Sequence, residues 1–400
     1  MMETNNENRS IIHMDLDSFF VSVECLIDSS LKGKPLLIGG NGGRGVVASC
    51  SYETRKFGVH SAMPMSLAKQ LCPDAIIISG DMEAYTRYSH MVTEIIADSA
   101  PLFEKSSIDE FYIDASGMDR FFGCFMWAKE LRQKIIKHTG LPLSMGLSAN
   151  KMVSKVATGE AKPCGEKRVI RGTEKAFLAP MPIRKIPMLG DKTARFLNDM
   201  GIGTVKVLRE MPVNMLEHIL GKNGRLIWNR AHGIDHSPVV PYAERKSISS
   251  EITFDSDTIN VQKLKALFVA MIEKLAFKLR KEKHLTSCLT VKIRYSDFET
   301  VTRQKHIPYT SSDHTLINLA LALFDKLYDR RLLIRLIGVR LSNLVHGHYQ
   351  IDLFDDTQEW IRLYQAMDHI KHKYGQEKVV RANTLGLSKR VRMDNNVFMG

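Results

Sequence analysis

Hydrophobic and polar positions alternate strictly in the first patterned stretch of the chain, IIHMDLD (11–17). A period of two is typical of a strand, and here the apolar positions share one face while His13, Asp15 and Asp17 share the other. The residues that follow, 18–27, change to helical spacing. We therefore predict a strand that leads into a helix, with two carboxylates emerging together on an exposed strand face.

Strands and helices are predicted to interleave through the first part of the chain. Helical spacing covers 84–100, 123–138 and 150–160, and short strand-like runs lie between these segments. Short helices punctuated by glycine follow over 183–232, and strands alternate with helices again over 250–345. The pattern predicts an α+β multidomain protein, in which a small helical region separates two α+β units.

Two adjacent acids, Asp109 and Glu110, lie among apolar neighbours in SSIDEFYID (106–114). Burying two like charges is costly unless something neutralises them. In a regular strand the two would point to opposite faces, so they converge only at a strand start, a turn or a bulge. Together with Asp15 they offer oxygen ligands to two divalent cations about 4 Å apart, the arrangement that serves phosphoryl transfer. The alternative is a pair of solvated charges on a hairpin.

The composition and the charge of the chain limit its class. The chain has 400 residues, which suggests two to four domains, and its 44% apolar content excludes a wholly disordered protein. A formal charge of +12 and a pI near 9.3 indicate a polyanionic partner, because basic surfaces release counterions from phosphate backbones. A generally basic surface without such a partner is the alternative.

The cysteines and the first residues bear on location. The six cysteines are scattered without a Cys-x-x-Cys pair, which argues against a zinc site or a disulfide framework and favours a reducing cytoplasm. Residues 1–10 are polar and include two acids, unlike the basic start and apolar stretch of a signal peptide. No window approaches about 18 uninterrupted apolar residues, so we expect no membrane span.

Four short motifs carry a resemblance to a known class of enzymes. They are, in this order, HMDLDSFFVSVE (13–24), YETRKFGV (52–59), SIDEFYID (107–114) and AKPCG (161–165). Together they resemble the Y-family translesion DNA polymerases, of the bacterial DNA polymerase IV type, over about residues 10–345. The resemblance implies template-directed, error-prone synthesis without proofreading, in which two metal ions assist transfer of a deoxynucleotide to a primer 3′ end with release of pyrophosphate.

The family has a right-hand architecture, and the resemblance extends it to this chain. The implied bounds are a palm at 10–20 and 78–166, fingers at 21–77, a helical thumb with a helix-hairpin-helix at 167–240, an α+β little finger at 241–345 and a C-terminal tail at 346–400. The implied partners are primer–template DNA and a dNTP. We expect a monomer that does not associate with a membrane.

Asp15, Asp109 and Glu110 match the metal-binding acids of the family, and the backbone carbonyl of Leu16 matches a further ligand position. The resemblance thus implies two Mg²⁺ ions per active site, for which Mn²⁺ can substitute. Glu110 is expected nearest the nucleophile, the primer 3′-hydroxyl. Asp17 shares the predicted face of Asp15 but matches no ligand position, so we favour a structural role for it.

Five residues match the nucleotide site of the family. Arg55 can fork two phosphate oxygens, Tyr52 can donate one hydrogen bond, and Lys162 supplies a point charge to the same triphosphate. Ser49 matches a further hydroxyl that contacts phosphate. Phe20 matches the steric gate, whose ring lies under the sugar and excludes a 2′-hydroxyl by van der Waals overlap.

Two regions are expected to hold DNA. IPMLGDKTARFLNDMGI (186–202) resembles the family's helix-hairpin-helix, in which N–H groups at a helix start bind a phosphate. Gly190 is kept, whereas Met188 stands where the first glycine of the hairpin is common. In the little finger, basic strand residues are expected to follow the duplex backbone without reading bases. They are Lys292, Arg294, Arg303, Arg335 and Arg340. A solvated, charged strand face is the alternative.

QIDLF (350–354) resembles the peptide by which bacterial polymerases bind the sliding clamp. Leu353 and Phe354 would enter an apolar pocket and Gln350 would anchor the peptide by hydrogen bonds. Beyond this peptide a predicted helix with one apolar face ends at Gly375. The pattern leaves open whether that helix docks on the polymerase, meets a partner or is only marginally stable alone.

Other classes of protein could use the same acids. Tyr52, Arg55 and Phe20 argue against a metal-dependent nuclease, and the basic little finger argues against a nucleotidyl cyclase. A third alternative is a catalytically silent DNA-binding relative. The presence of all three acids weighs against it, because loss of one would be its simplest signature.

Overall fold

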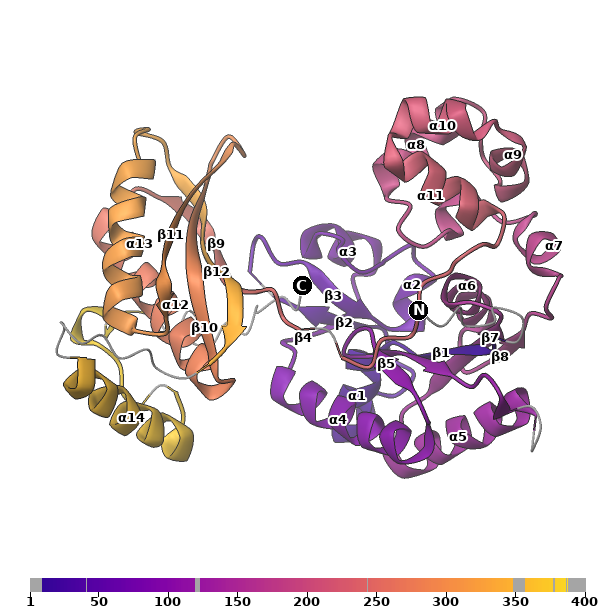
Figure 1. Cartoon of the computed structure of the whole chain (residues 1–400), viewed down its shortest axis with the longest axis horizontal. Helices are drawn as coiled ribbons and strands as arrows, with labels where there is room; N and C mark the ends of the chain where they lie inside the picture. The colour runs from indigo at the N-terminus through magenta and orange to yellow at the C-terminus, as the bar shows by residue number, and fades with distance from the viewer. Residues whose placement is uncertain are drawn as a thin grey trace. The chain divides into compact units, whose positions relative to one another are not determined.

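A computed structural model describes residues 9–40, 42–118, 123–242, 244–347, 357–376, 378–385 and 387 (Figure 1). The chain forms two compact units, and the division falls between residues 243 and 244. Within the described residues, no helix is both long enough and apolar enough to cross a membrane. Each unit has its own hydrophobic core, so each is described by itself.

A five-stranded sheet in the order β5-β6-β1-β7-β8 forms the centre of the first unit. β1 pairs antiparallel with both β6 and β7, while β8 runs parallel to β7. The strands are β1 (Ile11–Leu16), β5 (Phe103–Lys105), β6 (Glu110–Asp114), β7 (Leu143–Ser148) and β8 (Glu166–Arg168). The predicted strand 11–17 is therefore confirmed, and it lies in the middle of the sheet with every residue of β1 buried.

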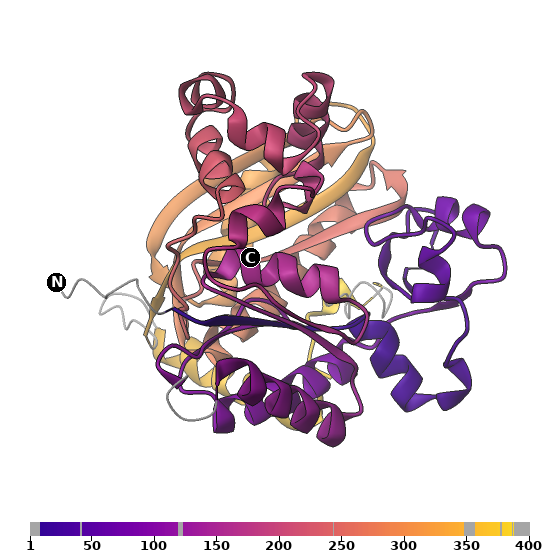
Figure 2. The ribbon, with the colours of Figure 1, turned by 90° about the vertical axis from the view of Figure 1, so that its right-hand side faces the viewer.

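Helices cover both faces of this sheet, as Figures 1 and 2 show from two sides. The apolar face of β1 joins a core with α4 (Met82–Ser99) and α5 (Cys124–Thr139), and α6 (Lys151–Ala161) packs on the opposite face. The three predicted helices are thereby confirmed. The expectation of an exposed polar face on β1 is wrong: Asp15 is 8% exposed and Asp17 1%, because α6 and the segment after it cover them.

A smaller sheet in the order β3-β2-β4 lies in the segment between β1 and α4 and has a core of its own. Its strands are β2 (Leu36–Gly39), β3 (Val47–Cys50) and β4 (Ile76–Ile78). The helices of this segment are α1 (Phe19–Ile27), α2 (Tyr52–Arg55) and α3 (Met65–Leu71), with the 3₁₀ turn η2 (Ser29–Leu31). Ser51 caps α2 by accepting a hydrogen bond from the Thr54 N–H, so a strand passes directly into a short helix.

Short helices follow the large sheet, as the glycine punctuation predicted. They are α7 (Glu174–Leu178), η4 (Ile183–Lys185), α8 (Asp191–Asp199), α9 (Val205–Glu210), α10 (Val213–Leu220) and α11 (Lys222–Ala231). Their apolar side chains form one cluster with Met152 and Val156 of α6, which joins this helical part to the sheet. The chain then returns across the sheet, where Val239 packs against Ile11 and Tyr112.

The second unit is a four-stranded antiparallel sheet in the order β11-β10-β12-β9. Its strands are β9 (Ser247–Thr258), β10 (His284–Tyr295), β11 (Thr300–Thr310) and β12 (Ile334–His346). The helices α12 (Val261–Lys281) and α13 (Asp313–Leu327) cover one face through a shared core. The predicted second α+β unit is confirmed, and the uncovered face of its sheet carries the polar residues of the alternating strands.

A last helix, α14 (Thr357–Tyr374), docks on the helical side of the second unit, and η5 (Ala382–Thr384) follows it. The Arg280 guanidinium is 4% exposed and binds Asp313 at 2.5 Å and Asp368 of α14 at 2.6 Å. Tyr364 is buried, and its hydroxyl lies 2.7 Å from Nδ1 of His314. The question that the sequence left open is thus answered, since α14 belongs to the fold of this unit.

Candidate active site

Strand pairing brings the three predicted acids to one end of the central strand. Asp15 of β1 lies directly opposite Glu110, the first residue of β6. The Leu16 N–H donates a hydrogen bond of 3.0 Å to the carbonyl oxygen of Asp109, which holds the residue before β6 against the same point of β1. The adjacent acids therefore stand at a strand start, one of the three places where such a pair can converge.

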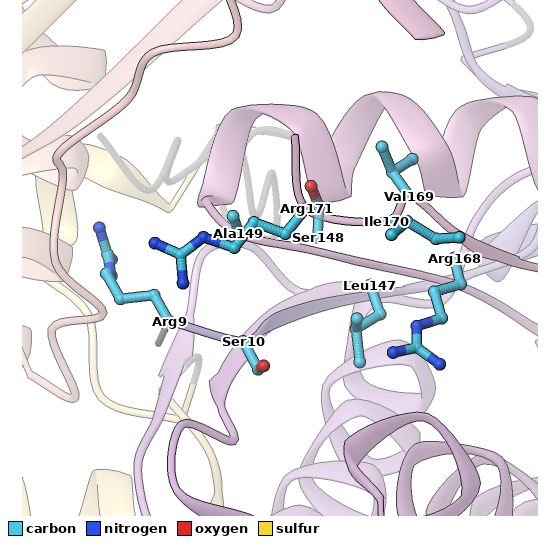
Figure 3. A pocket seen from close by; sticks show the side chains of 9 residues that line it. All are labelled: Arg9, Ser10, Leu147, Ser148, Ala149, Arg168, Val169, Ile170 and Arg171. Carbon is cyan, nitrogen blue, oxygen red and sulfur yellow. The ribbon is translucent and has the colours of Figure 1, made fainter. Parts of the chain in front are cut away.

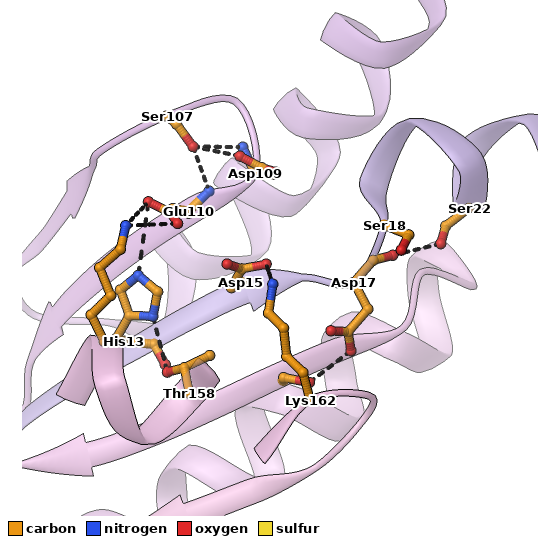
Figure 4. A network of polar contacts seen from close by, with 12 residues as sticks. His13, Asp15, Asp17, Ser18, Ser22, Ser107, Asp109, Glu110, Thr158 and Lys162 are labelled. Atoms are coloured by element: carbon orange, nitrogen blue, oxygen red, sulfur yellow. Dashed lines mark hydrogen bonds and ion pairs between the residues drawn. The ribbon is translucent and has the colours of Figure 1, made fainter. Parts of the chain in front are cut away.

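Lysines and a hydroxyl bind these carboxylates, as Figure 4 shows. Lys162, just after α6, places its Nζ 2.5 Å from Oδ1 of Asp15. Lys155 of α6 donates to both carboxylate oxygens of Glu110, at 2.8 and 2.6 Å. The Ser107 hydroxyl donates to Oδ1 of Asp109 at 2.5 Å. Ammonium groups thus neutralise the buried carboxylate of Asp15 and the half-buried carboxylate of Glu110.

Burial raises the pKa of two of these acids, Asp15 and Asp109. It raises the pKa of Asp15 to about 7, the attraction of Lys162 opposes this rise, and repulsion by Asp109 and Glu110 adds to it. Burial also raises the pKa of Asp109. The repulsion that Asp15 receives from both other acids shows that the three charges act on one another at short range.

The donor set fits a hard divalent cation. Carboxylate oxygens are the ligands that Mg²⁺ and Mn²⁺ prefer, and the raised pKa of Asp15 indicates that this buried site is short of positive charge when its acids are ionised. In the described part of the chain no cluster of three or more His, Cys, Asp or Glu side chains is close enough to hold a metal ion as it stands. Lys155 and Lys162 hold two of the three carboxylates in this arrangement.

Asp17 has partners of a different kind, which accords with a structural role. Its carboxylate accepts hydrogen bonds from the Ser144 hydroxyl at 2.7 Å, the Cys164 N–H at 2.8 Å and the Tyr52 hydroxyl at 3.2 Å. Three donors from separate elements satisfy a buried carboxylate without a cation. Asp17 thus connects β1 to β7, to the segment after α6 and to Tyr52.

Of the predicted nucleotide residues, Tyr52, Arg55 and Lys162 bind side chains at the acid-bearing end of β1. Arg55 stacks over the Tyr52 ring at 4.7 Å and donates to the Ser18 hydroxyl at 3.1 Å. Phe20 stacks on Tyr85 of α4, with ring centroids 4.3 Å apart and planes at 14°. Ser49 is buried in β3, two residues before the cap of α2, and Lys162 lies beside Asp15, as described.

In the hairpin before α8, the backbone of Met188 has a conformation that is typical of glycine. Met188 has φ +64°, in the left-handed region, and its side chain is 82% exposed. Arg230 supports this turn by donating to the Pro187 carbonyl oxygen at 2.6 Å. Gly190 precedes the first turn of α8, whose N–H groups point out of the helix end. Methionine at position 188 therefore adopts a backbone conformation that favours glycine.

The basic strand residues of the second unit are only partly brought together. The β10–β12 register places Arg340 opposite Thr290, so Arg340 shares the uncovered face with Lys292 and Arg294. Arg303 instead lies opposite buried Val291. Arg335 stacks over Phe298 at 4.5 Å, and Lys292 is paired with Glu251 at 2.9 Å. The predicted clamp residues Gln350, Leu353 and Phe354 lie outside the described residues.

Sequence reasoning missed several polar partners in the site. Lys155 binds Glu110. Nδ1 of buried His13 lies 2.9 Å from the Thr158 hydroxyl, and burial lowers the pKa of His13 well below its usual value. A signal for Lys155 existed, because Lys151, Lys155 and Lys162 recur at helical spacing. The helical pattern alone does not reveal that this side of α6 faces the acids.

The raised pKa of Asp15 predicts a pH dependence of stability in the metal-free protein. Between its ordinary value of 3.8 and the folded value of about 7, the folded protein binds more protons than the unfolded chain, so the free energy of unfolding falls as pH rises. Asp15→Asn removes this contribution. We measure the melting temperature of the variant minus that of wild type, both in EDTA. We expect this difference to be larger at pH 8 than at pH 5. A difference that is equal at both pH values would contradict this assignment.

Comparisons with known proteins agree with one another. The impB/mucB/samB family matches residues 14–159, and the C-terminal domain of that family matches residues 245–353. A DNA polymerase IV of Dehalococcoides mccartyi is 38% identical over 383 residues, which cover 95% of this chain and 98% of that protein. A solved Y-family DNA polymerase chimera of Dbh and Dpo4 is 28% identical, covers 84% of this chain and 100% of its own, and has a TM-score of 0.71. The structure of an insertion ternary complex of Dbh DNA polymerase is also 28% identical. The match covers 84% of this chain and 100% of that chain, with a TM-score of 0.60.

Proposed function

Because the chain belongs to the Y-family DNA polymerases, which carry out template-directed translesion synthesis, we propose that Asp15, Asp109 and Glu110 are its catalytic acids. The enzyme is a DNA-directed DNA polymerase that depends on divalent metal and acts on DNA and dNTPs. The observation that carries the assignment is the pairing of Asp15 with Glu110, with Asp109 hydrogen-bonded to the next residue of β1.

We propose that two Mg²⁺ ions, or Mn²⁺ in their place, bind these acids together with the carbonyl oxygen of Leu16. When bound, such ions lower the pKa of the primer 3′-hydroxyl and neutralise the pyrophosphate that leaves. Glu110 then lies nearest the hydroxyl. Lys162, released from Asp15, is free to bind the triphosphate. Two divalent ions bring more positive charge to the three carboxylates than the two ammonium groups that they replace.

The residues around the acids bind and select the nucleotide in this proposal. Arg55 and Tyr52 are already stacked on each other, which orders a guanidinium fork and a phenol for the phosphate oxygens. Ser49 adds a hydroxyl from β3. Phe20, held flat against Tyr85, forms the floor under the sugar and excludes a 2′-hydroxyl.

We propose a palm at 10–20 and 78–166, fingers at 21–77, a thumb at 167–240, a little finger at 241–345 and a tail at 346–400. The large sheet with its helices supports the palm, and the small sheet supports the fingers. The short helices support the thumb, and the four-stranded sheet of the second unit supports the little finger. We propose that the N–H groups after Gly190 bind a DNA phosphate and that the uncovered basic face of the little finger follows the duplex backbone.

Primer extension tests the proposed chemistry directly. We expect incorporation of single dNTPs opposite undamaged and lesion-bearing templates with Mg²⁺ and with Mn²⁺, and none with EDTA. Lack of extension with both metals would identify the chain as a silent DNA-binding relative. The scattered cysteines support a reducing cytoplasm, and we propose a monomer there, which sedimentation of the purified chain would test.

We propose that Gln350, Leu353 and Phe354 bind the sliding clamp, and the double variant Leu353→Ala/Phe354→Ala tests this. We expect it to lose stimulation by the clamp while extending short primers at a rate close to wild type, because the peptide lies far along the chain from the acids. Two buried apolar anchors contribute on the order of 3–6 kcal/mol, enough to prevent useful binding of a micromolar peptide. Unchanged affinity of the double variant in a direct clamp titration would show that the peptide is not the binding site.

A further inference from the structure

Lys155 of α6 binds the carboxylate of Glu110 through both of its oxygens. Its Nζ lies 2.8 Å from Oε1 and 2.6 Å from Oε2, and the side chain of Glu110 is 20% exposed. A hard divalent cation would bind the same oxygens. It would then lie beside an ammonium group, and like charges a few ångströms apart repel each other strongly in a partly buried site. The contact with Lys155 thus bears directly on how Glu110 binds a metal ion.

The exposure of Lys155 distinguishes it from the other lysine on this face of α6. Lys151 stands four residues earlier and binds Glu104 in the same way, with its Nζ 2.7 Å from both oxygens. The side chain of Lys151 is 15% exposed, whereas that of Lys155 is 34% exposed. Lys155 can therefore turn its ammonium group into water while its alkyl chain stays on the protein.

His13 does not share the Glu110 carboxylate with Lys155, although it lies beside it (Figure 4). Nδ1 of His13 is 2.9 Å from the Thr158 hydroxyl, and that hydroxyl donates to main-chain carbonyl oxygens at 3.0 Å. Nδ1 therefore supplies the proton of this contact, which leaves a lone pair on Nε2 of the neutral ring. Nε2 is 4.0 Å from Oε2 of Glu110 and has no hydrogen-bond partner among the described residues. Lys155 is thus the cation that holds this carboxylate.

The arginines at the opposite end of β1 lie far from the acids. Arg9 and Arg171 line a hollow there (Figure 3). Its wall includes Ser148, which lies opposite Ile11, four residues along β1 from Asp15, or roughly 13 Å. These arginines are therefore too distant to take over the neutralisation of the acids.

We propose that Lys155 is a displaceable partner of Glu110, which holds the carboxylate while no divalent ion is bound and leaves it when an ion binds. This inference rests on the metal site proposed above. Lys155 has no part in the proposed triphosphate site, which includes Lys162, and it is a positioning residue that acts through Glu110. It keeps the Glu110 carboxylate in place beside Asp15, and it lowers the affinity of the site for metal because its charge must first be displaced.

Binding of Mn²⁺ to the full-length chain without DNA tests the proposal, because the electron paramagnetic resonance signal of free Mn²⁺ reports how much ion is bound. We expect Lys155→Met to bind Mn²⁺ about three- to tenfold more tightly than wild type, since one partly exposed ion pair no longer competes for the carboxylate. Lys151→Met is the matched control, because it removes the same contact from Glu104, which lies outside the metal site. We expect it to bind Mn²⁺ as wild type does.

Lys155→Arg should change the affinity in the opposite direction. A guanidinium fork matches two carboxylate oxygens better than an ammonium group does, so we expect this variant to bind Mn²⁺ more weakly than wild type. It retains the positive charge and therefore serves if Lys155→Met does not fold. The proposal is overturned if Lys155→Met binds Mn²⁺ no more tightly than wild type, or, where that variant does not fold, if Lys155→Arg binds Mn²⁺ at least as tightly as wild type.

Glu110→Gln separates failure of this inference from failure of the proposed metal site. The amide has nearly the same shape without the charge, so we expect Mn²⁺ binding at this site to be lost. Glu110→Gln that binds Mn²⁺ as wild type does would refute the metal site, and the inference with it. If Glu110→Gln loses the ion and Lys155→Met gains no affinity, the acids bind metal but Lys155 does not compete with it, and the inference alone is overturned.

Discussion

Asp15→Ala is expected to abolish primer extension while leaving primer–template binding within a few fold of wild type. Asp15 lies opposite Glu110 and feels the charge of both other acids, so its removal takes away one side of the proposed metal site. Loss of several kcal/mol of charge stabilisation in the transition state corresponds to a rate decrease on the order of 10³-fold or more. DNA contacts are proposed elsewhere, in the hairpin before α8 and in the second unit, and remain intact.

Asp109→Ala and Glu110→Ala should behave in the same way. Asp114→Ala is the matched control, because this acid ends the same strand, β6, and pairs with Ile11 at the other end of β1. We expect it to extend primers normally. Single-turnover extension and fluorescence anisotropy of labelled primer–template separate the two effects. A variant of any of the three acids that extends primers at the wild-type rate would remove that residue from the site.

Phe20→Val is expected to admit ribonucleotides. The Phe20 ring is stacked on Tyr85, which is 1% exposed and hydrogen-bonded to Glu24 at 2.5 Å, so the ring cannot withdraw from a 2′-hydroxyl. Steric overlap costs about 1–3 kcal/mol. The preference for dNTP over rNTP, measured as a ratio of kcat/KM values, should therefore fall roughly 10- to 100-fold.

Phe19→Val distinguishes a gate from a general loosening of this region. Phe19 is the adjacent aromatic residue, but it is 3% exposed and packs in the core of the large sheet. We expect Phe19→Val to lower the melting temperature without changing sugar selection. If both variants accept ribonucleotides equally, or if neither does, Phe20 is not the gate.

The sequence predicts the strand faces and the positions of the acids better than it predicts which elements cover them. Alternation in 11–17 correctly assigns the two faces of β1, and the Asp109–Glu110 pair stands at a strand start as its chemistry requires. The burial of Asp15 and its pairing with Lys162 were not predictable from these motifs, because they depend on how α6 packs across the sheet. Local patterns report the period of an element, whereas the docking of two distant elements follows from the whole core.

The hairpin before α8 illustrates a second limit of prediction from the sequence. Met188 breaks the usual glycine pattern, yet its backbone adopts the left-handed conformation and Arg230 holds the turn. A non-glycine residue pays a conformational cost there that surrounding contacts can offset.

The docking of α14 limits how far the chain between β12 and α14 can reach from the second unit. β12 ends at His346 and α14 begins at Thr357, and both ends are fixed to the same unit through the sheet and the Arg280–Asp368 pair. Nine residues, 348–356, lie between the described flanks and can span at most about 32 Å when fully extended. Under the clamp binding proposed for residues 350–354, the clamp would therefore stay close to the second unit. To gain more reach, the enzyme must first detach α14 and break a buried ion pair.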